Sequence, residues 1–302
     1  MVTQMEKKSK GKMFLSVLGC LVPMLIFWGV QMVIGVIAGI VIVVATIVQN
    51  SSFQTATQLE DLMYQNIAQS MPYLLLASTL STTIIGFIWY RKKYKKRYDY
   101  SLKEVAKAKD YIYIVLTALA ASFSIDLIIL LVAAIFPHAL SNYENLMDAA
   151  GIGSSAIAFL TAAFLAPIGE ECIFRGVIQR KAEKFMPFVL ANLLQAFLFG
   201  VMHWNIVQSS YAFVLGLILG YIRHKYQTVR MSVLFHMVFN IIGQTVPMLT
   251  ADLSDTVNLI IALASIPFMA YILKLISQVD IPAKPYIEPQ PQMAYGYGQP
   301  ME

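Results

Sequence analysis

Eight apolar runs, each long enough to cross a lipid bilayer, constrain this fold more than any other feature of the chain. A spanning helix needs about 20 mainly apolar residues, because the hydrocarbon core is about 30 Å thick. The composition agrees, with 58% hydrophobic and 13% charged residues among 302. We therefore expect an all-α, polytopic membrane bundle of about eight transmembrane helices that encloses an intramembrane polar cavity. The runs are residues 14–48, 70–90, 111–136, 154–179, 187–203, 207–222, 230–249 and 256–276.

The first run, 14–48, is too long for one upright crossing. As a continuous helix it would measure roughly 50 Å, against a hydrocarbon core of about 30 Å. A steep tilt, a break near Gly29, Gly35 or Gly39, or extension past the surface would fit this length. A cleaved signal peptide has a shorter apolar region of about 7–15 residues, so a retained anchor is the better interpretation.

The positive charges are completely segregated along the chain. All 22 lysines and arginines lie in the segments 7–12, 91–109, 175–184, 223–230 and 274–284, and the connections 49–69, 137–153, 204–206 and 250–255 contain none. The positive-inside rule then predicts an integral, multi-pass protein with both termini in the cytoplasm, which we assign to a bacterial plasma membrane. The net charge of +5 reports this topology and contact with the lipid bilayer, and we expect no nucleic-acid partner.

Ionisable residues recur within the apolar runs of the second half. Each such group costs roughly 2.5–3.5 kcal/mol at membrane depth on insertion scales, so a chain that keeps several of them is expected to use them. A buried ion-pair network that only fixes helix packing is the alternative. The three stretches concerned are Glu170-Glu171-Cys172-Ile173-Phe174-Arg175, Phe199-Gly200-Val201-Met202-His203 and His236-Met237-Val238-Phe239-Asn240.

Spacing within the first stretch separates its two carboxylates. Residues four apart share a helix face, so Glu171 and Arg175 can pair, whereas Glu170 points elsewhere and is free to act as a base. Pro167 and Gly169 directly precede it. A proline and a glycine there loosen the helix and can leave backbone groups facing a water-filled cavity.

The other two stretches follow the same rule. His236 and Asn240 lie one turn apart on one face of their helix, and Phe199 lies under His203 on another. We therefore expect three helices to converge on one polar pocket. For His203 to reach it, the stretch 186–192 would have to run along the inner surface before its helix enters the membrane. The pocket should open toward the cytoplasmic half, with Glu170 and His236 roughly 10–15 Å deep.

In these residues the chain resembles the CAAX protease and bacteriocin-processing (CPBP, or Abi) intramembrane endopeptidases. That family shares the motifs Glu-Glu-x-x-x-Arg, Phe-x-x-x-His and His-x-x-x-Asn/Asp, and all three are present here in the family's order, over roughly residues 154–250. The resemblance implies hydrolysis of a peptide bond in a peptide or protein substrate at the membrane.

The resemblance also implies a role for each motif residue. Glu170 and His203 would activate water, while His236 and Asn240 would stabilise the developing oxyanion. Donors aimed at an oxyanion contribute several kcal/mol in such a site. The supporting residues would be Glu171, Arg175 and Phe199.

Metal use is a separate question, because members of this family are often called metalloproteases. Glu170, His203 and His236 could supply three zinc ligands and leave one position open for water. The chain has no His-Glu-x-x-His, however, and the three candidates come from three separate helices. We expect catalysis without a metal cofactor and keep zinc as the alternative.

The chain divides into four segments. We expect a basic cytoplasmic tail over 1–13, N-terminal transmembrane helices over 14–153, a catalytic core over 154–279 and a disordered cytoplasmic tail rich in Pro, Tyr and Gln over 280–302. Gly35-x-x-x-Gly39 and Gly216-x-x-x-Gly220 are expected to allow close helix packing inside the chain.

Two other functions remain open. A non-catalytic membrane scaffold or bacteriocin-immunity protein would use the motifs only to hold its helices together. A proton-coupled transporter would also place Glu, His and Arg at membrane depth, although transporters usually show two similar halves and these residues are all in the second half.

Overall fold

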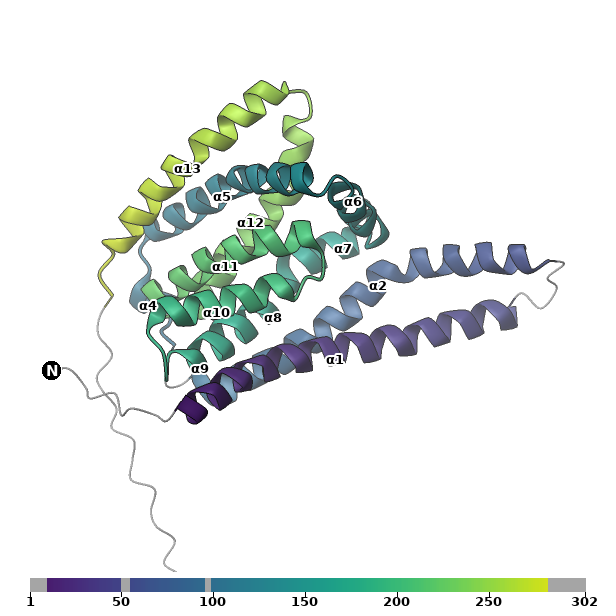
Figure 1. Ribbon diagram of the computed structural model, residues 1–302, viewed down its shortest axis with the longest axis horizontal. Coiled ribbons are helices and arrows are strands. Elements are labelled where there is room, and N and C mark those ends of the chain that lie inside the picture. The colour runs from purple at the N-terminus through teal and green to yellow at the C-terminus, as the bar shows by residue number, and fades with distance from the viewer. Residues whose placement is uncertain (1–9, 50–54, 96–98, 282–302) are drawn as a thin grey trace, which may run out of the picture.

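The computed structural model describes residues 10–49, 55–95 and 99–281, and the regular structure in these ranges is helical throughout. Figure 1 shows the long helices as one bundle, from which a hairpin of two helices extends. The long helices are α1 (Lys10–Gln49), α2 (Ala56–Tyr90), α5 (Ala108–Ile135), α11 (Ile206–Tyr226), α12 (Val229–Thr250) and α13 (Asp255–Ser277). The shorter ones are η1 (Arg91–Lys95), α4 (Leu102–Val105), α6 (Ala139–Ala149), α7 (Ala156–Leu160), η2 (Thr161–Leu165), α8 (Ala166–Glu171), η3 (Cys172–Gln179), α9 (Arg180–Ala182) and α10 (Phe188–Val201).

Seven helical stretches in the described ranges are long and apolar enough to cross a membrane. This confirms the prediction of an all-α, polytopic bundle. The eighth predicted run, 187–203, forms the shorter helix α10. Its 14 residues measure about 21 Å, less than the hydrocarbon core. The helix ends early because Asn205 caps the next one, its side chain accepting hydrogen bonds from the amides of Val207 and Gln208 at 3.0 and 3.2 Å.

The ends of the helices that carry lysine and arginine meet at one end of the molecule, which we call the basic end (Figure 1). There Lys225 Nζ donates to the carbonyl of Ser277 at 2.7 Å, and the amide of Val229 donates to Asp99 Oδ1 at 3.0 Å. The first and last described helices thus begin and end on the same side. The cytoplasmic placement of this side stays a prediction.

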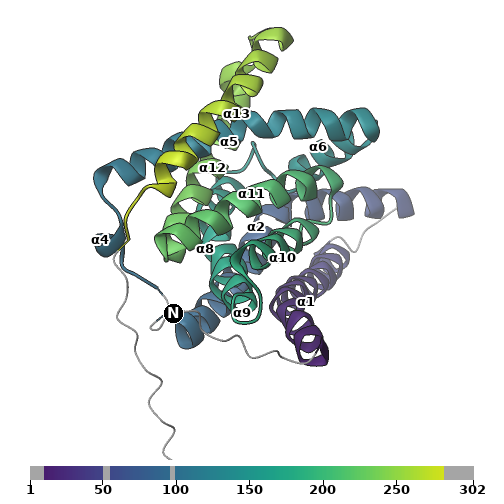
Figure 2. The same ribbon diagram turned by 60° about the vertical axis from the view of Figure 1, so that its left-hand side comes forward.

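The structure of α1 narrows the alternatives given for the long apolar run 14–48. Helix α1 runs for 40 residues without a break, which excludes a break at its glycines and leaves tilt or extension to accommodate its length. In Figure 1 the far part of the hairpin of α1 and α2 extends beyond the other helices, and Figure 2 shows α1 at the side of the bundle. In this far part Asn66 Nδ2 of α2 donates to Thr46 Oγ1 of α1 at 2.8 Å. The helix begins within the predicted 1–13 tail, of which residues 1–9 lie outside the described ranges, as do residues 282–302 of the C-terminal tail.

The two glycine pairs have different environments. The prediction of internal packing is wrong for Gly35 and Gly39, because a Cβ built at either position would meet nothing within 4 Å. It is confirmed for Gly216 and Gly220. A Cβ on Gly216 would lie 2.9 Å from the Ala196 backbone, and one on Gly220 would overlap the side chain of Asn192 in α10. These glycines therefore allow α10 and α11 to form a tight antiparallel pair.

The helix that carries the first motif is continuous from 156 to 182 but contains two stretches of π-helix, η2 and η3. Pro167 lies just after η2, where its missing amide hydrogen disturbs the normal hydrogen-bond ladder. Gly169 has a packing role that was not predicted. A Cβ there would lie 2.5 Å from Thr83 Oγ1, so this glycine permits the close approach of α2.

A polar network at the basic end fixes this helix against α11. The guanidinium of Arg223 donates two hydrogen bonds to the carboxylate of Glu183, at 2.7 and 3.0 Å, and a third to Gln179 Oε1 at 3.1 Å. Burial alone would raise the pKa of Glu183, but His224 and Arg223 together outweigh burial and hold that pKa at about 2. The network therefore positions the first motif relative to the second half of the bundle.

Candidate active site

Glu171 is the centre of a fully buried ion network. Its Oε1 atom accepts hydrogen bonds from Arg175 Nη1 at 2.7 Å and from His236 Nδ1 at 3.0 Å. The side chains of Glu171 and Arg175 are both 0% exposed. The pair between Glu171 and Arg175 predicted from their spacing is confirmed, whereas the contact with His236, 65 positions away, was not predicted.

The guanidinium of Arg175 joins this network to two further helices. Its Cζ lies 4.2 Å from the centre of the Phe199 ring, and its Nη2 donates to the carbonyl of Gly216 at 3.4 Å. That carbonyl also accepts from Gln195 Nε2 at 2.8 Å. A planar guanidinium suits this position, since it can stack on a ring and donate in its own plane.

The imidazole of His236 lies between two carboxylates. Its Nδ1 is bonded to Glu171, and its Nε2 lies 3.8 Å from Glu170 Oε2. Within the described residues, Glu170 makes no shorter polar contact than this one. Its side chain is 15% exposed, against 0% for Glu171. Glu170 is therefore the carboxylate with oxygen atoms free for another ligand.

The imidazole of His203 is oriented by its own helix. His203 follows the end of α10, and its Nδ1 lies 2.8 Å from the carbonyl of Phe199. A carbonyl only accepts hydrogen bonds, so Nδ1 carries the proton and a neutral ring has its free lone pair at Nε2.

The ring of Phe199 forms the apolar base of the site. Its centre lies 5.1 Å from the ring of His203 and 5.8 Å from that of His236, both edge to face. The predicted placement of Phe199 under His203 is thus confirmed. Its contacts with both imidazoles and with Arg175 show that the three motifs converge, as we expected from their helical spacing.

Asn240 follows His236 by one turn in α12. Its Nδ2 donates to the carbonyl of Ala162, in the π-helical stretch η2, at 2.8 Å. A primary amide has two N–H donors, so one remains for another acceptor.

The predicted route of His203 into the site is wrong in one respect. The stretch 186–192 does not run separately along a surface, because α10 begins at Phe188, whose ring stacks on His224 at 3.8 Å at the basic end.

Metal-free catalysis and the zinc alternative both stay predictions. Among the described residues, no group of three or more His, Cys, Asp and Glu side chains is placed to hold a metal ion. Nδ1 of His203 and Nδ1 of His236 are engaged, with the carbonyl of Phe199 and with Glu171 respectively. This arrangement leaves Nε2 as the available nitrogen of each ring, for water or for a metal.

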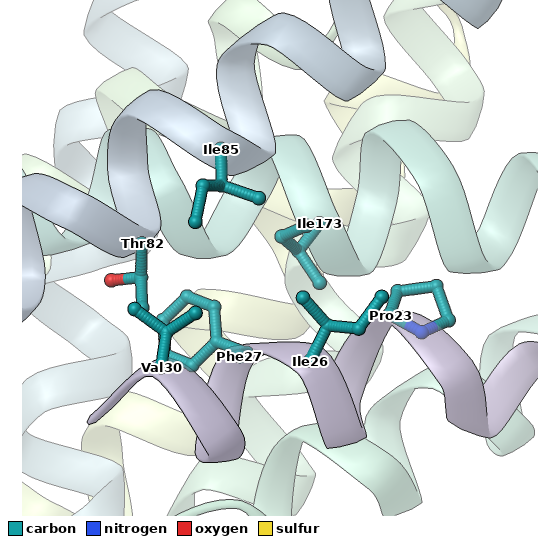
Figure 3. Close-up of a pocket in the computed structure, with 7 residues that line it drawn as sticks. All are labelled: Pro23, Ile26, Phe27, Val30, Thr82, Ile85 and Ile173. Carbon is teal, nitrogen blue, oxygen red and sulfur yellow. The ribbon is translucent and has the colours of Figure 1, made fainter. Parts of the chain in front are cut away.

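A shallow apolar depression, which we call the apolar pocket, lies beside the first motif, between α1, α2 and η3 (Figure 3). It differs from the expected polar cavity, which stays a prediction. One of its walls is Ile173, a residue within the Glu-Glu-x-x-x-Arg motif. The lining residues are Pro23, Ile26, Phe27, Val30, Thr82, Ile85 and Ile173.

Two residues that contact the site lie outside the three motifs and were not predicted. Gln195 is 0% exposed and shares the Gly216 carbonyl with Arg175. Trp28, in the first helix, donates from Nε1 to the carbonyl of Met202 at 3.2 Å. A polar side chain inside an apolar helix could have drawn attention to Gln195, but nothing in the sequence connects Trp28 with a residue 174 positions away.

The fold and site together define a helical membrane bundle with buried carboxylate, imidazole and guanidinium groups. Residues 152–242 match the family described as type II CAAX prenyl endopeptidase Rce1-like. This match contains all three motifs and confirms the resemblance that they predict. No curated protein and no solved structure matches the chain. The seven apolar helices and the family match together identify an integral membrane protein and support a peptidase activity.

Proposed function

We propose that this protein is an intramembrane endopeptidase in which Glu170 and His203 activate a water molecule. The observation that carries the proposal is the convergence of the three motifs on one site. There Glu171 is fully buried and paired through Oε1 with Arg175 and His236, whereas Glu170 makes no polar contact shorter than 3.8 Å among the described residues. A general base must have a free lone pair within reach of the proton that it abstracts. Glu170 has such lone pairs, and so does a neutral His203 at Nε2.

The reaction needs no nucleophilic serine or cysteine. Glu170 accepts a proton from water as the water oxygen attacks the peptide carbonyl carbon. The C–N bond then breaks, and the proton passes to the leaving amine. His203 assists by accepting a hydrogen bond from the water at Nε2.

His236 and Asn240 are proposed to stabilise the oxyanion. Nδ1 of His236 donates to Glu171, which also accepts from Arg175. In the proposed step His236 acts in its protonated form, which has a second donor at Nε2. Asn240 supplies its remaining N–H. Preorganised donors of this kind are worth about 3–4 kcal/mol each in comparable sites.

The family description suggests the class of substrate. A prenylated peptide has a long apolar chain close to the bond that is cut, and the matched family is described as prenyl endopeptidases. We therefore propose a prenylated, CAAX-type peptide as the first substrate to try, presented in the bilayer, with the site opening toward the basic end.

The test uses purified protein reconstituted in liposomes with a farnesylated CAAX-type peptide, and mass spectrometry of the products. Wild type should release the C-terminal fragment, while Glu170→Ala and His203→Ala should release none above background. Glu144→Ala and His138→Ala are matched controls, because both residues are exposed and lie outside the three motifs.

A second arm covers a substrate of another kind. Membrane and secreted peptides from cells that express wild type or Glu170→Ala are compared by mass spectrometry, and a precursor should accumulate with the variant. Equal processing by Glu170→Ala and wild type would overturn the proposal. A scaffold role would instead leave both peptide profiles unchanged.

A further inference from the structure

The turn that carries His203 is held from outside by helix α1. Trp28 Nε1 donates to the carbonyl of Met202 at 3.2 Å, and the Trp28 ring lies 4.5 Å from the ring of Trp204. Met202 and Trp204 are the two chain neighbours of His203. One side chain of α1 thus contacts both residues that flank a proposed catalytic imidazole.

Local geometry explains why this turn needs an external partner. Met202 is the C-cap of α10, and the last carbonyls of a helix have no partner within it. Trp204 has a φ of 57°, in the left-handed region that bulky residues rarely adopt. Such a conformation persists only where its surroundings enforce it. The indole of Trp28 supplies both a hydrogen-bond donor and an aromatic contact.

The part of α1 around residues 19–28 packs against the bundle. Cys20, Met24 and Phe27 form a buried face that belongs to the same apolar cluster as Phe199 and Met202. A hydrogen bond from the Lys181 ammonium to the Gly19 carbonyl fixes α1 to the end of the motif helix. Trp28 therefore projects from a rigid support toward the turn.

The orientation of His203 then depends on two hydrogen bonds with different origins. One runs from its own Nδ1 to the carbonyl of Phe199 in α10, at 2.8 Å. The other runs from Trp28 to the carbonyl of Met202 in the adjoining turn. The first sets the rotation of the ring, and the second sets the position of the backbone from which the ring projects.

We propose that Trp28 is a positioning residue for His203, so that α1 completes an active site whose family match covers only 152–242. The catalytic part of this proposal rests on the function proposed above. A displacement of about 1 Å at a reacting group can cost about 100-fold in rate. Loss of the Trp28 contact should therefore lower kcat by roughly 10- to 100-fold and change KM little.

The test compares Trp28→Phe, which keeps a ring but loses the N–H donor, with Trp89→Phe as the matched control. Trp28, Trp89 and Trp204 are the three tryptophans of the chain, and Trp89 lies in α2 away from the turn. Trp28→Phe should lower kcat and leave the melting temperature close to that of Trp89→Phe. The exciton signal of the Trp28–Trp204 pair in circular dichroism should disappear in Trp28→Phe and persist in Trp89→Phe.

A readout independent of catalysis separates this proposal from the proposed function. The rate at which diethyl pyrocarbonate modifies His203, followed by mass spectrometry, should rise several-fold in Trp28→Phe and stay unchanged in Trp89→Phe. If wild type cleaves no peptide but His203 responds in this way, the positioning role stands and the peptidase proposal fails. Unchanged modification and unchanged kcat in Trp28→Phe would overturn the positioning role.

Discussion

Replacing Glu171 with alanine tests how strongly the buried ion network holds the fold. The change removes the acceptor of two short hydrogen bonds, from Arg175 at 2.7 Å and from His236 at 3.0 Å. The guanidinium of Arg175 would remain 0% exposed, with the Gly216 carbonyl at 3.4 Å and the Phe199 ring at 4.2 Å as its remaining partners. Neither group carries a compensating charge.

The expected destabilisation follows from this imbalance. Removing one partner of a buried ion pair costs about 3–5 kcal/mol, because the other charge is left uncompensated. Whole domains are stable by only about 5–15 kcal/mol. At about 2–4 °C per kcal/mol for larger domains, the melting temperature of Glu171→Ala should fall by roughly 10 °C.

Thermal unfolding in detergent, followed by circular dichroism, measures this effect. Glu144→Ala, in the exposed helix α6, is the matched control and should change stability by no more than about 0.5 kcal/mol. The double variant Glu171→Ala/Arg175→Leu should melt above Glu171→Ala, since it leaves no unpaired guanidinium. A Glu171→Ala protein that melts like Glu144→Ala but cleaves nothing would refute this reasoning and place Glu171 among the reacting groups.

Three further outcomes are expected. The pKa of Glu183 is lowered to about 2, so its contribution to stability is present above about pH 4.5 and is lost as the pH falls toward 2. The melting temperature of Glu183→Gln should therefore depend less on pH over this range than that of wild type. A reporter fused after Leu140 should lie outside the cell, and one fused after Lys184 should lie in the cytoplasm. A cytoplasmic signal at Leu140 would contradict the predicted topology. Gly216→Val should destabilise the protein by about 1–3 kcal/mol in detergent melting, whereas an unchanged melting temperature would show that α10 can move away.

The spacing of residues along a helix predicted the contacts between residues of the same helix. The pairing of Glu171 with Arg175 and the position of Phe199 under His203 follow from a spacing of four residues. The convergence of the three motifs was expected from the helix faces on which their residues lie. The packing role of Gly216 and Gly220 could also be read from their spacing, although the same spacing misled at Gly35 and Gly39.

Contacts between distant segments could not be predicted in this way. Periodicity indicates the face on which His236 lies, but not that its Nδ1 bonds Glu171 rather than Glu170. The π-helical stretches change the hydrogen-bond register without changing the apolar pattern. The apolar run 187–203 was read as one span because hydropathy does not register the cap at Asn205, which ends the helix early and brings His203 into a turn.

In the proposed mechanism Glu170 acts as the general base, without a metal. The most direct test is the kcat of wild type and of Glu170→Gln on the same peptide in liposomes, both freed of zinc by a strong chelator. We predict that wild type keeps its activity and that Glu170→Gln loses about 100- to 10,000-fold, the usual contribution of a general base. The account would be contradicted if Glu170→Gln retained its turnover, or if wild type lost activity and stoichiometric zinc restored it.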